Sequence, residues 1–362
     1  MKWIRGAVGA LFLALASAPA SAQLQIKNED VTIKFGFVGQ FWADWTQDAT
    51  AASAGSQGYQ QNFFLRRARI MMGGNVGDKI SFFFQTDDPK LGITPKNLAT
   101  GFILQDAWME YKVSNQLQIA GGEMLVPFSR QALQSPVSYY SVDISSVSTV
   151  NNAALQQSGL RDMGFQAKGY FLKDRLQYRG GMFSGARDSN ARNPLRQALY
   201  VQYDFFSPEK EYAYAGTALG KRKILAVDAG GDKQGSYRAY SANVASDTPV
   251  RGGDEAGFNL QYLHFDGRDK FLTVPAQNNF LAEAAYYVHQ AKCQPFGRWE
   301  TQRFVAAVNG TKDINRVGGG VNYYLRGQNL KWTFQYLRAL PQNGSPIRPG
   351  NEFTVQLQAF YF

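Results

Sequence analysis

The sequence is poor in the residues that build metal and redox sites, and it lacks catalytic signatures. Cys293 is its only cysteine, which excludes an intrachain disulfide and any paired-cysteine site. His264 and His289 lie far apart in the chain, so we expect no metal ligation by them. No GxSxG, HExxH or P-loop motif occurs. We therefore predict no metal, no cofactor and no enzyme; a catalytic triad assembled in three dimensions is the alternative.

Long apolar runs are absent after the N-terminus, so the mature chain offers no transmembrane helix. The apolar segment 7–18 follows the basic residues Lys2 and Arg5 and precedes the small residues 20–22 (ASA). It is shorter than the ~20 residues that a spanning helix needs. This pattern predicts a signal peptide at 1–22 and an exported mature domain at 23–362. A retained N-terminal anchor is the alternative.

Acidic residues are fewer than basic ones, and the formal net charge is +10. Removal of Lys2 and Arg5 with the leader lowers it to +8. A basic chain can bind nucleic acid, but export argues against that partner. We expect the excess charge to set a field for small anions in a confined channel. Alternatively, a basic outer surface pairs with anionic lipid headgroups.

Apolar and polar residues alternate along most of the chain, which indicates an all-β protein. In the first such segment, Val31, Ile33 and Phe35 alternate with Thr32 and Lys34. Turn residues bound about sixteen segments of this kind. The expected strands are 31–46, 59–76, 79–88, 102–114, 117–126, 162–172, 175–184, 195–206, 222–230, 237–250, 257–266, 279–288, 295–304, 315–326, 330–340 and 352–362.

The connections between these segments alternate in length, and every second one is a tight turn. Outer-membrane barrels combine short periplasmic turns with longer external loops, whereas a soluble sandwich has no reason to do so. An even strand number suits a closed antiparallel transmembrane β-barrel in the outer membrane, surrounded by lipid. No Pro/Ser-rich linker divides the chain, although its length would also allow two small domains.

The third long connection, 127–161, is longer than the others. Loops of this length are usually functional or disordered. A barrel of ~16 strands encloses an aqueous lumen, so we expect this loop to fold inward and narrow the pore. An external flap over the mouth is the alternative.

Basic residues recur on the strand faces that parity assigns to the lumen. Rings of Arg and Lys favour anions, because a fixed positive field replaces part of the lost hydration. Alternatively, these residues pair with Asp106, Glu110, Glu283 and Glu300 and stiffen the wall. On 59–76, the same parity points Arg66 outward. Ten residues are candidates for lining the pore or binding anions, nine from these strands and one from the long loop. They are Lys34, Arg67, Arg69, Arg130, Lys168, Arg175, Arg179, Arg298, Arg316 and Lys331.

The last segment ends in Phe362, and a terminal aromatic on an amphipathic strand resembles the C-terminal signature of bacterial outer-membrane proteins. Val355, Leu357, Ala359 and Tyr361 share one face. Gln356 and Gln358 share the face of Phe362 instead, which departs from the usual apolar pattern.

Several segments resemble the phosphate-selective porin O and P family. They are 63–69 (FFLRRAR) with Gly77-Asp78, 106–111 (DAWMEY), 126–130 (VPFSR), 161–164 (RDMG), 322–325 (NYYL) and the final strand. The resemblance implies a trimeric, sixteen-stranded barrel with an inward third loop and an anion-preferring lumen. It also makes Arg67, Arg69 and Arg130 candidate anion contacts. The loop carries only Arg130 and Arg161 as basic residues, fewer than the family's phosphate channels.

The expected function is therefore that of an outer-membrane porin, a passive channel for small hydrophilic solutes with a mild preference for anions, phosphate among the candidates. A barrel that serves as a scaffold or docking site for a periplasmic or extracellular partner is the alternative. A barrel enzyme is a second one, and it would need a Ser or Asp beside His264 or His289.

Overall fold

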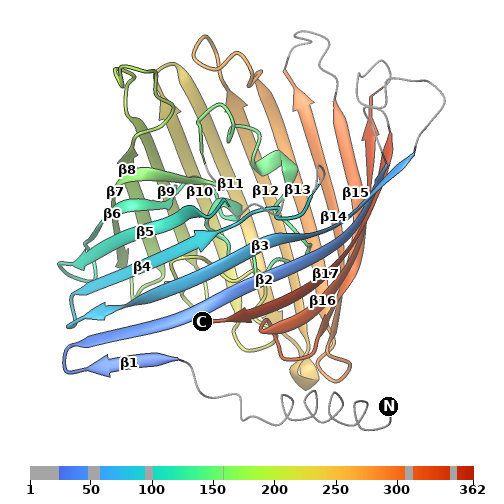
Figure 1. Cartoon of the computed structure of the whole chain (residues 1–362), viewed down its shortest axis with the longest axis horizontal. Helices are drawn as coiled ribbons and strands as arrows, with labels where there is room; N and C mark the ends of the chain where they lie inside the picture. Colours follow the sequence, from blue (N-terminus) through green and yellow to red (C-terminus); the bar gives the residue numbers. More distant parts are fainter. Residues whose placement is uncertain (1–23, 48–57, 94–100, 158, 306–312, 343–348) are drawn as a thin grey trace, which may run out of the picture.

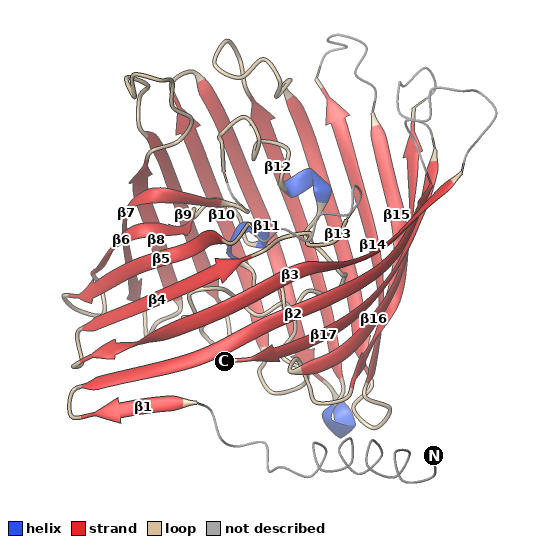
Figure 2. Ribbon diagram, viewed as in Figure 1, coloured by secondary structure: helices blue, strands red, loops and turns tan. Residues whose placement is uncertain are grey.

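A computed structural model describes residues 24–47, 58–93, 101–157, 159–305, 313–342 and 349–362. The expected signal peptide and its cleavage site lie outside these residues. The described chain forms one antiparallel sheet that closes on itself as a barrel of sixteen strands with one extra strand. Figures 1 and 2 show the tilted strands around a central space that the chain itself enters. This confirms the predicted fold class.

The strands are β1 (Gln25–Asn28), β2 (Val31–Gln47), β3 (Tyr59–Val76), β4 (Ile80–Asp87), β5 (Ile103–Lys112), β6 (Gln118–Leu125), β7 (Arg161–Phe171), β8 (Leu176–Phe183), β9 (Arg196–Asp204), β10 (Ile224–Gln234), β11 (Tyr237–Pro249), β12 (Glu255–Asp266), β13 (Gln277–Tyr287), β14 (Cys293–Phe304), β15 (Ile314–Tyr324), β16 (Leu330–Pro341) and β17 (Gly350–Tyr361). Three short 3-10 helices accompany them: η1 (Gln131–Leu133), η2 (Ser146–Ser148) and η3 (Arg251–Gly253). Among the described residues, no helix is long and apolar enough to cross a membrane.

Strands β2 to β17 correspond to the sixteen segments expected from the sequence. Each pairs with its neighbours in chain order, and β17 pairs with β2 to close the ring. The short β1 was not expected. It pairs with residues 31–34 of β2, beyond the point where β17 ends. Cys293, which the sequence placed in a turn, begins β14 and is half-buried.

The two ends of the barrel differ. At the end where β17 finishes, which we call the turn end, residues 77–79 and 172–175 join strands tightly. Gly77 supplies a positive φ of 59° for the first of these turns. At the opposite, loop end lie the long connection 126–160 and most other long connections. The predicted alternation is wrong on both sides of β10: the connection 205–223 before it is long although it lies at the turn end, and the connection 235–236 after it is a tight turn although it lies at the loop end.

The wall has an apolar outside and a polar inside, because side chains of a strand alternate between its faces. Large apolar side chains are exposed all around the outer surface, among them Ile70, Phe84, Met109, Phe165, Leu199, Leu260, Val317 and Phe334. The inner face carries buried polar side chains, among them Gln85, Asp106, Gln177, Gln202, Asp232, Asn259, Glu283 and Gln335. A continuous apolar exterior around a polar interior is the arrangement of a barrel surrounded by lipid.

Candidate functional site

The long connection between β6 and β7, residues 126–160, lies inside the barrel. The Ser146 hydroxyl donates to Glu300 Oε2 on β14 at 2.8 Å. The Gln358 side chain on β17 donates to the Val137 carbonyl at 3.0 Å. In the strand order, β14 lies opposite β6 and β7, and β17 lies five strands from β6. The connection therefore spans the lumen, and we call it the crossing loop.

A second segment, 205–223 between β9 and β10, enters the lumen from the turn end. Its Tyr214 pairs with Gln134 of the crossing loop in a parallel β-bridge. The Tyr214 N–H donates to the Leu133 carbonyl at 2.7 Å, and the Ser135 N–H donates to the Tyr214 carbonyl at 2.8 Å. We call this segment the turn-end loop. The two loops together form one layer of chain inside the barrel.

An ion pair holds the two loops together. Arg130 of the crossing loop lies 2.7 Å from Glu209 of the turn-end loop, and both side chains are buried. The Arg130 guanidinium also lies over the Tyr214 ring, 5.1 Å from its centroid. Arg179 on β8 fixes the turn-end loop from the wall, since its guanidinium donates to the carbonyls of Glu211 and Tyr212.

On the other side of the crossing loop, a β-bulge aims two adjacent arginines at one carboxylate. Gln40 pairs with Arg67 and Phe41 with Leu65, which leaves Arg66 as the extra residue. Arg66 Nη2 and Arg67 Nη2 each lie 2.6 Å from a carboxylate oxygen of Asp143 in the crossing loop. The prediction that Arg66 points outward is therefore wrong, because the bulge reverses the parity of the strand at this position.

Two further arginines that line this region form ion pairs with carboxylates on neighbouring strands of the wall. Arg69 on β3 lies 2.8 Å from Asp87 on β4. Arg161, the first residue of β7, lies 3.2 Å from Asp106 on β5. The carboxylates hold the guanidinium groups in place at the inner face of the wall.

Two cavities lie between the crossing loop and the wall of β2 to β5. The first has a volume of about 420 Å³ and reaches Ile103 and Asn152 near the loop end. The second has a volume of about 550 Å³ and reaches Lys34 and Phe362 at the turn end. Arg69, Pro136 and Arg161 line both cavities. The two cavities therefore adjoin at a boundary whose charged groups are both arginines.

The charges around this path are nearly balanced. Four arginines and two aspartates line the first cavity: Arg66, Arg67, Arg69, Arg161, Asp87 and Asp143. The second cavity adds Lys34, Asp106 and Glu211. Glu211 in turn pairs with Arg222. The arrangement places cations at the shared boundary and sets carboxylates behind them.

The carboxyl group of Asp143 in the crossing loop keeps its negative charge over a wide range of pH. Burial acts to raise the pKa of Asp143, but the charges of Arg67 and Arg66 and its hydrogen bonds outweigh burial and hold that pKa well below the usual range. Asp143 therefore stays ionised throughout the physiological range of pH.

Five of the ten candidate residues from the sequence form ion pairs. Those five are Arg67 and Arg69, which lie together at the cavities, Arg130, Lys168 and Arg298. The partners of Arg130, Lys168 and Arg298 are Glu209, Glu110 and Glu300, respectively. Arg179 and Lys331 are buried and donate to loop carbonyls. Of these seven residues, the structure thus brings together Arg67 and Arg69 at the cavities and does not bring the other five to them.

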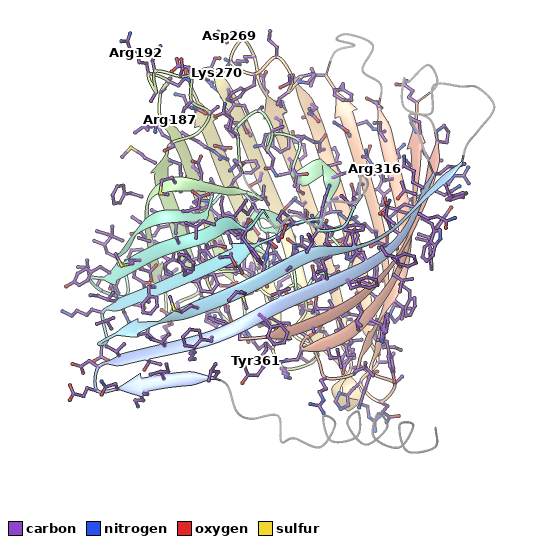
Figure 3. All side chains as sticks on the ribbon, viewed as in Figure 1. Arg187, Arg192, Asp269, Lys270, Arg316 and Tyr361 are labelled. Atoms are coloured by element: carbon purple, nitrogen blue, oxygen red, sulfur yellow. The ribbon has the colours of Figure 1, made fainter. Side chains whose placement is uncertain are left out.

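Three candidates have no ion pair within the described part of the chain. Lys34 lines the second cavity. Arg316 shares the inward face of Glu300, to which it is the cross-strand neighbour, and Figure 3 shows it nearer the loop end. Arg175, predicted on the lumen face of β8, instead lies exposed in the turn before that strand.

Sequence reasoning missed the turn-end loop and the roles of Arg66, Arg161 and Asp143. A signal for the loop was present: the sequence Tyr212-Ala213-Tyr214 puts two aromatics in a connection that would otherwise face water. Both tyrosines pack inside the barrel, against Trp108 and Tyr200 respectively.

Neither histidine takes part in a catalytic arrangement in the described residues. His264 lies on the outer side of β12, stacked on Tyr240, with its Nδ1 2.9 Å from Asn278 Oδ1. His289 lies exposed in the turn before β14. Groups of three or more His, Cys, Asp or Glu that could hold a metal do not occur in the described ranges.

A family model supports the resemblance seen in the sequence. The model of phosphate-selective porin O and P matches residues 35–193. This stretch holds most of β2, the strands β3 to β8, the crossing loop and the paired arginines of the wall. Among curated proteins, a sequence search finds no match.

Several solved structures share the fold. An anion-selective porin from Comamonas acidovorans matches with a TM-score of 0.64 at 12% identity, covering 91% of this chain and 100% of that one. OmpF of Salmonella typhi, in complex with daunomycin, matches with a TM-score of 0.61 at 13% identity, covering 93% and 100%. The trimer form of OmpT, an outer membrane protein of Vibrio cholerae, matches with a TM-score of 0.57 at 14% identity, covering 91% and 99%.

Proposed function

We propose that this chain, an outer-membrane porin and passive diffusion channel, passes small hydrophilic solutes with a mild preference for anions. The observation that carries the preference is the boundary between the two cavities, where Arg69 and Arg161 are the charged groups. Fixed guanidinium groups replace part of an anion's lost hydration, and their field is stronger beside low-dielectric protein than in bulk water. The preference is mild because Asp87 and Asp106 pair with these arginines.

Phosphate is one candidate solute among several. The two basic residues of the crossing loop region, Arg130 and Arg161, are both paired with carboxylates. The loop therefore supplies no cluster of unpaired basic residues, among its described residues, that would favour a multiply charged anion. We propose small monoanions as the better class of solute.

We further propose that the barrel is the single domain of the mature chain, 23–362, exported by the signal peptide 1–22, and that it assembles as a homotrimer. The trimer form of the Vibrio cholerae protein supports the assembly by similarity of fold. The apolar outer face fits contact with outer-membrane lipid. We propose no nucleic-acid partner, because the chain is expected to be exported. We propose no catalysis, because His264 faces outward and His289 lies in an exposed turn.

Planar bilayer recording of the purified protein tests this function. We expect uniform conductance steps and, under a tenfold salt gradient, a zero-current potential of the sign that anion permeation gives. Absence of steps would overturn the channel, and the opposite sign would overturn the anion preference alone.

A further inference from the structure

The second cavity has an aromatic wall on its β4 and β5 side. Phe83 on β4 and Trp108 on β5 face inward, and their ring centroids lie 6.0 Å apart. Tyr212 of the turn-end loop lies 4.8 Å from Trp108 and 6.0 Å from Phe83. These rings line the cavity beside Arg69 and Arg161.

The last residue of the chain completes this wall. Phe362 lies edge-on to Phe83, with 5.5 Å between ring centroids. Gly73 leaves room for it, since a Cβ there would lie 2.9 Å from Phe362 Cζ. The polar residues Gln356 and Gln358 share its face because this face lines the lumen. The chain terminus therefore contributes its ring to the cavity instead of to the lipid-facing surface.

Cations flank the aromatic wall at both ends of the cavity. Lys34 lies at the turn end and has no ion pair among the described residues, while Arg69 and Arg161 lie at the boundary with the first cavity. The indole N–H of Trp108 is buried and finds no acceptor in the described part of the protein. The protein thus supplies an apolar surface, positive charge and a spare donor in one place.

We propose that this channel selects aromatic monocarboxylates, with the ring of the solute held against Phe83, Trp108 and Tyr212 and its carboxylate drawn by Lys34 and then by Arg69 and Arg161. The proposal rests on the anion-preferring pore proposed above and names its solute class. Aromatic rings attract one another in offset and edge-to-face arrangements. A multiply charged, strongly hydrated anion such as phosphate gains nothing from an apolar wall and loses hydration there. A cavity of about 550 Å³ has the size of ordinary small-molecule sites.

The test measures block of the single-channel chloride current by benzoate, acetate or inorganic phosphate, with the full-length mature protein in planar bilayers. We expect benzoate to half-block at a concentration at least about tenfold lower than acetate, which corresponds to about 1.4 kcal/mol. Phosphate should block no better than acetate. Equal half-blocking concentrations for benzoate and acetate in an anion-preferring channel would overturn the proposal and leave the proposed function standing.

Two neighbours on β4 provide a matched pair of variants. Phe83→Leu should raise the half-blocking concentration of benzoate about fivefold or more and leave that of acetate unchanged. Phe84→Leu, whose side chain is exposed on the outer face, should change neither value. Lys34→Gln should weaken block by benzoate and acetate by the same factor. Equal effects of the two phenylalanine variants would refute the aromatic contact, and the wild-type comparison decides the proposal even where a variant fails to insert. A protein that forms no channel, or a cation-selective one, would overturn the proposed function together with this inference.

Discussion

Arg130 and Glu209 form a buried ion pair, 2.7 Å between Nη1 and Oε2, that joins two loops entering the barrel from opposite ends. The crossing loop supplies the arginine and the turn-end loop supplies the glutamate. Together the loops occupy the part of the lumen next to β9 to β17 and leave the two cavities along β2 to β5. We propose that solutes pass along this wall on an off-centre path whose width the two loops decide.

Glu209→Gln tests this joint. The substitution leaves the Arg130 guanidinium buried without its counter-charge, and such a loss typically costs about 3–5 kcal/mol. We expect the turn-end loop to dissociate from the crossing loop part of the time. The open-channel current noise should then rise and the mean conductance should increase. Asp174→Asn is the control, because its pair with Lys210 is largely exposed and exposed pairs contribute about 0–1 kcal/mol. Identical noise in the two variants would refute the joint.

Shortening the crossing loop tests its place in the path. Replacement of residues 138–152 by a short glycine linker removes the contacts of Ser146 and Asp143 with the wall. Single-channel conductance should then rise several-fold, since the wall of a barrel of ~16 strands alone encloses a wide aqueous lumen. Removing the exposed residues 189–192 at the loop end is the control and should leave conductance unchanged. An unchanged conductance after the first deletion would place the crossing loop outside the conducting path.

The pH dependence of conductance tests the contact between Asp143 and Arg66 and Arg67. These arginines lower the pKa of Asp143. The free energy by which this contact holds the crossing loop against the wall is therefore fully present above pH ~4, the ordinary pKa of Asp, and is lost only as pH falls through the lowered pKa. Conductance should therefore stay constant from pH 7 to pH 4. Asp143→Asn should already show raised conductance at pH 7. A wild-type conductance that rises with a midpoint near pH 4 would contradict this account.

The strands could be predicted because their signal is local. Residues 59–76 alternate and end at a turn, and β3 has these bounds. The orientation of Arg66 could not be predicted, since the bulge that turns it inward depends on how β3 pairs with β2. The ion pair of Arg130 with Glu209 joins residues far apart in the sequence. Parity identified inward-facing arginines, but which carboxylate each of them meets depends on strand pairing, as for Arg69 with Asp87, and on the folded loops, as for Arg67 with Asp143.

The central claim is that the arginines lining the two cavities give the path its anion preference. The most direct test is the zero-current potential in a salt gradient, measured for the wild type and for Arg67→Ala combined with Arg69→Ala. The wild type should favour anions at 0.1 M salt and less so at 1 M, because the Debye length falls from ~10 Å to ~3 Å. The double variant leaves Asp143 and Asp87 without these partners, so its potential should shift toward cation permeation. A cation-selective wild type, or a double variant with an unchanged potential, would contradict the claim.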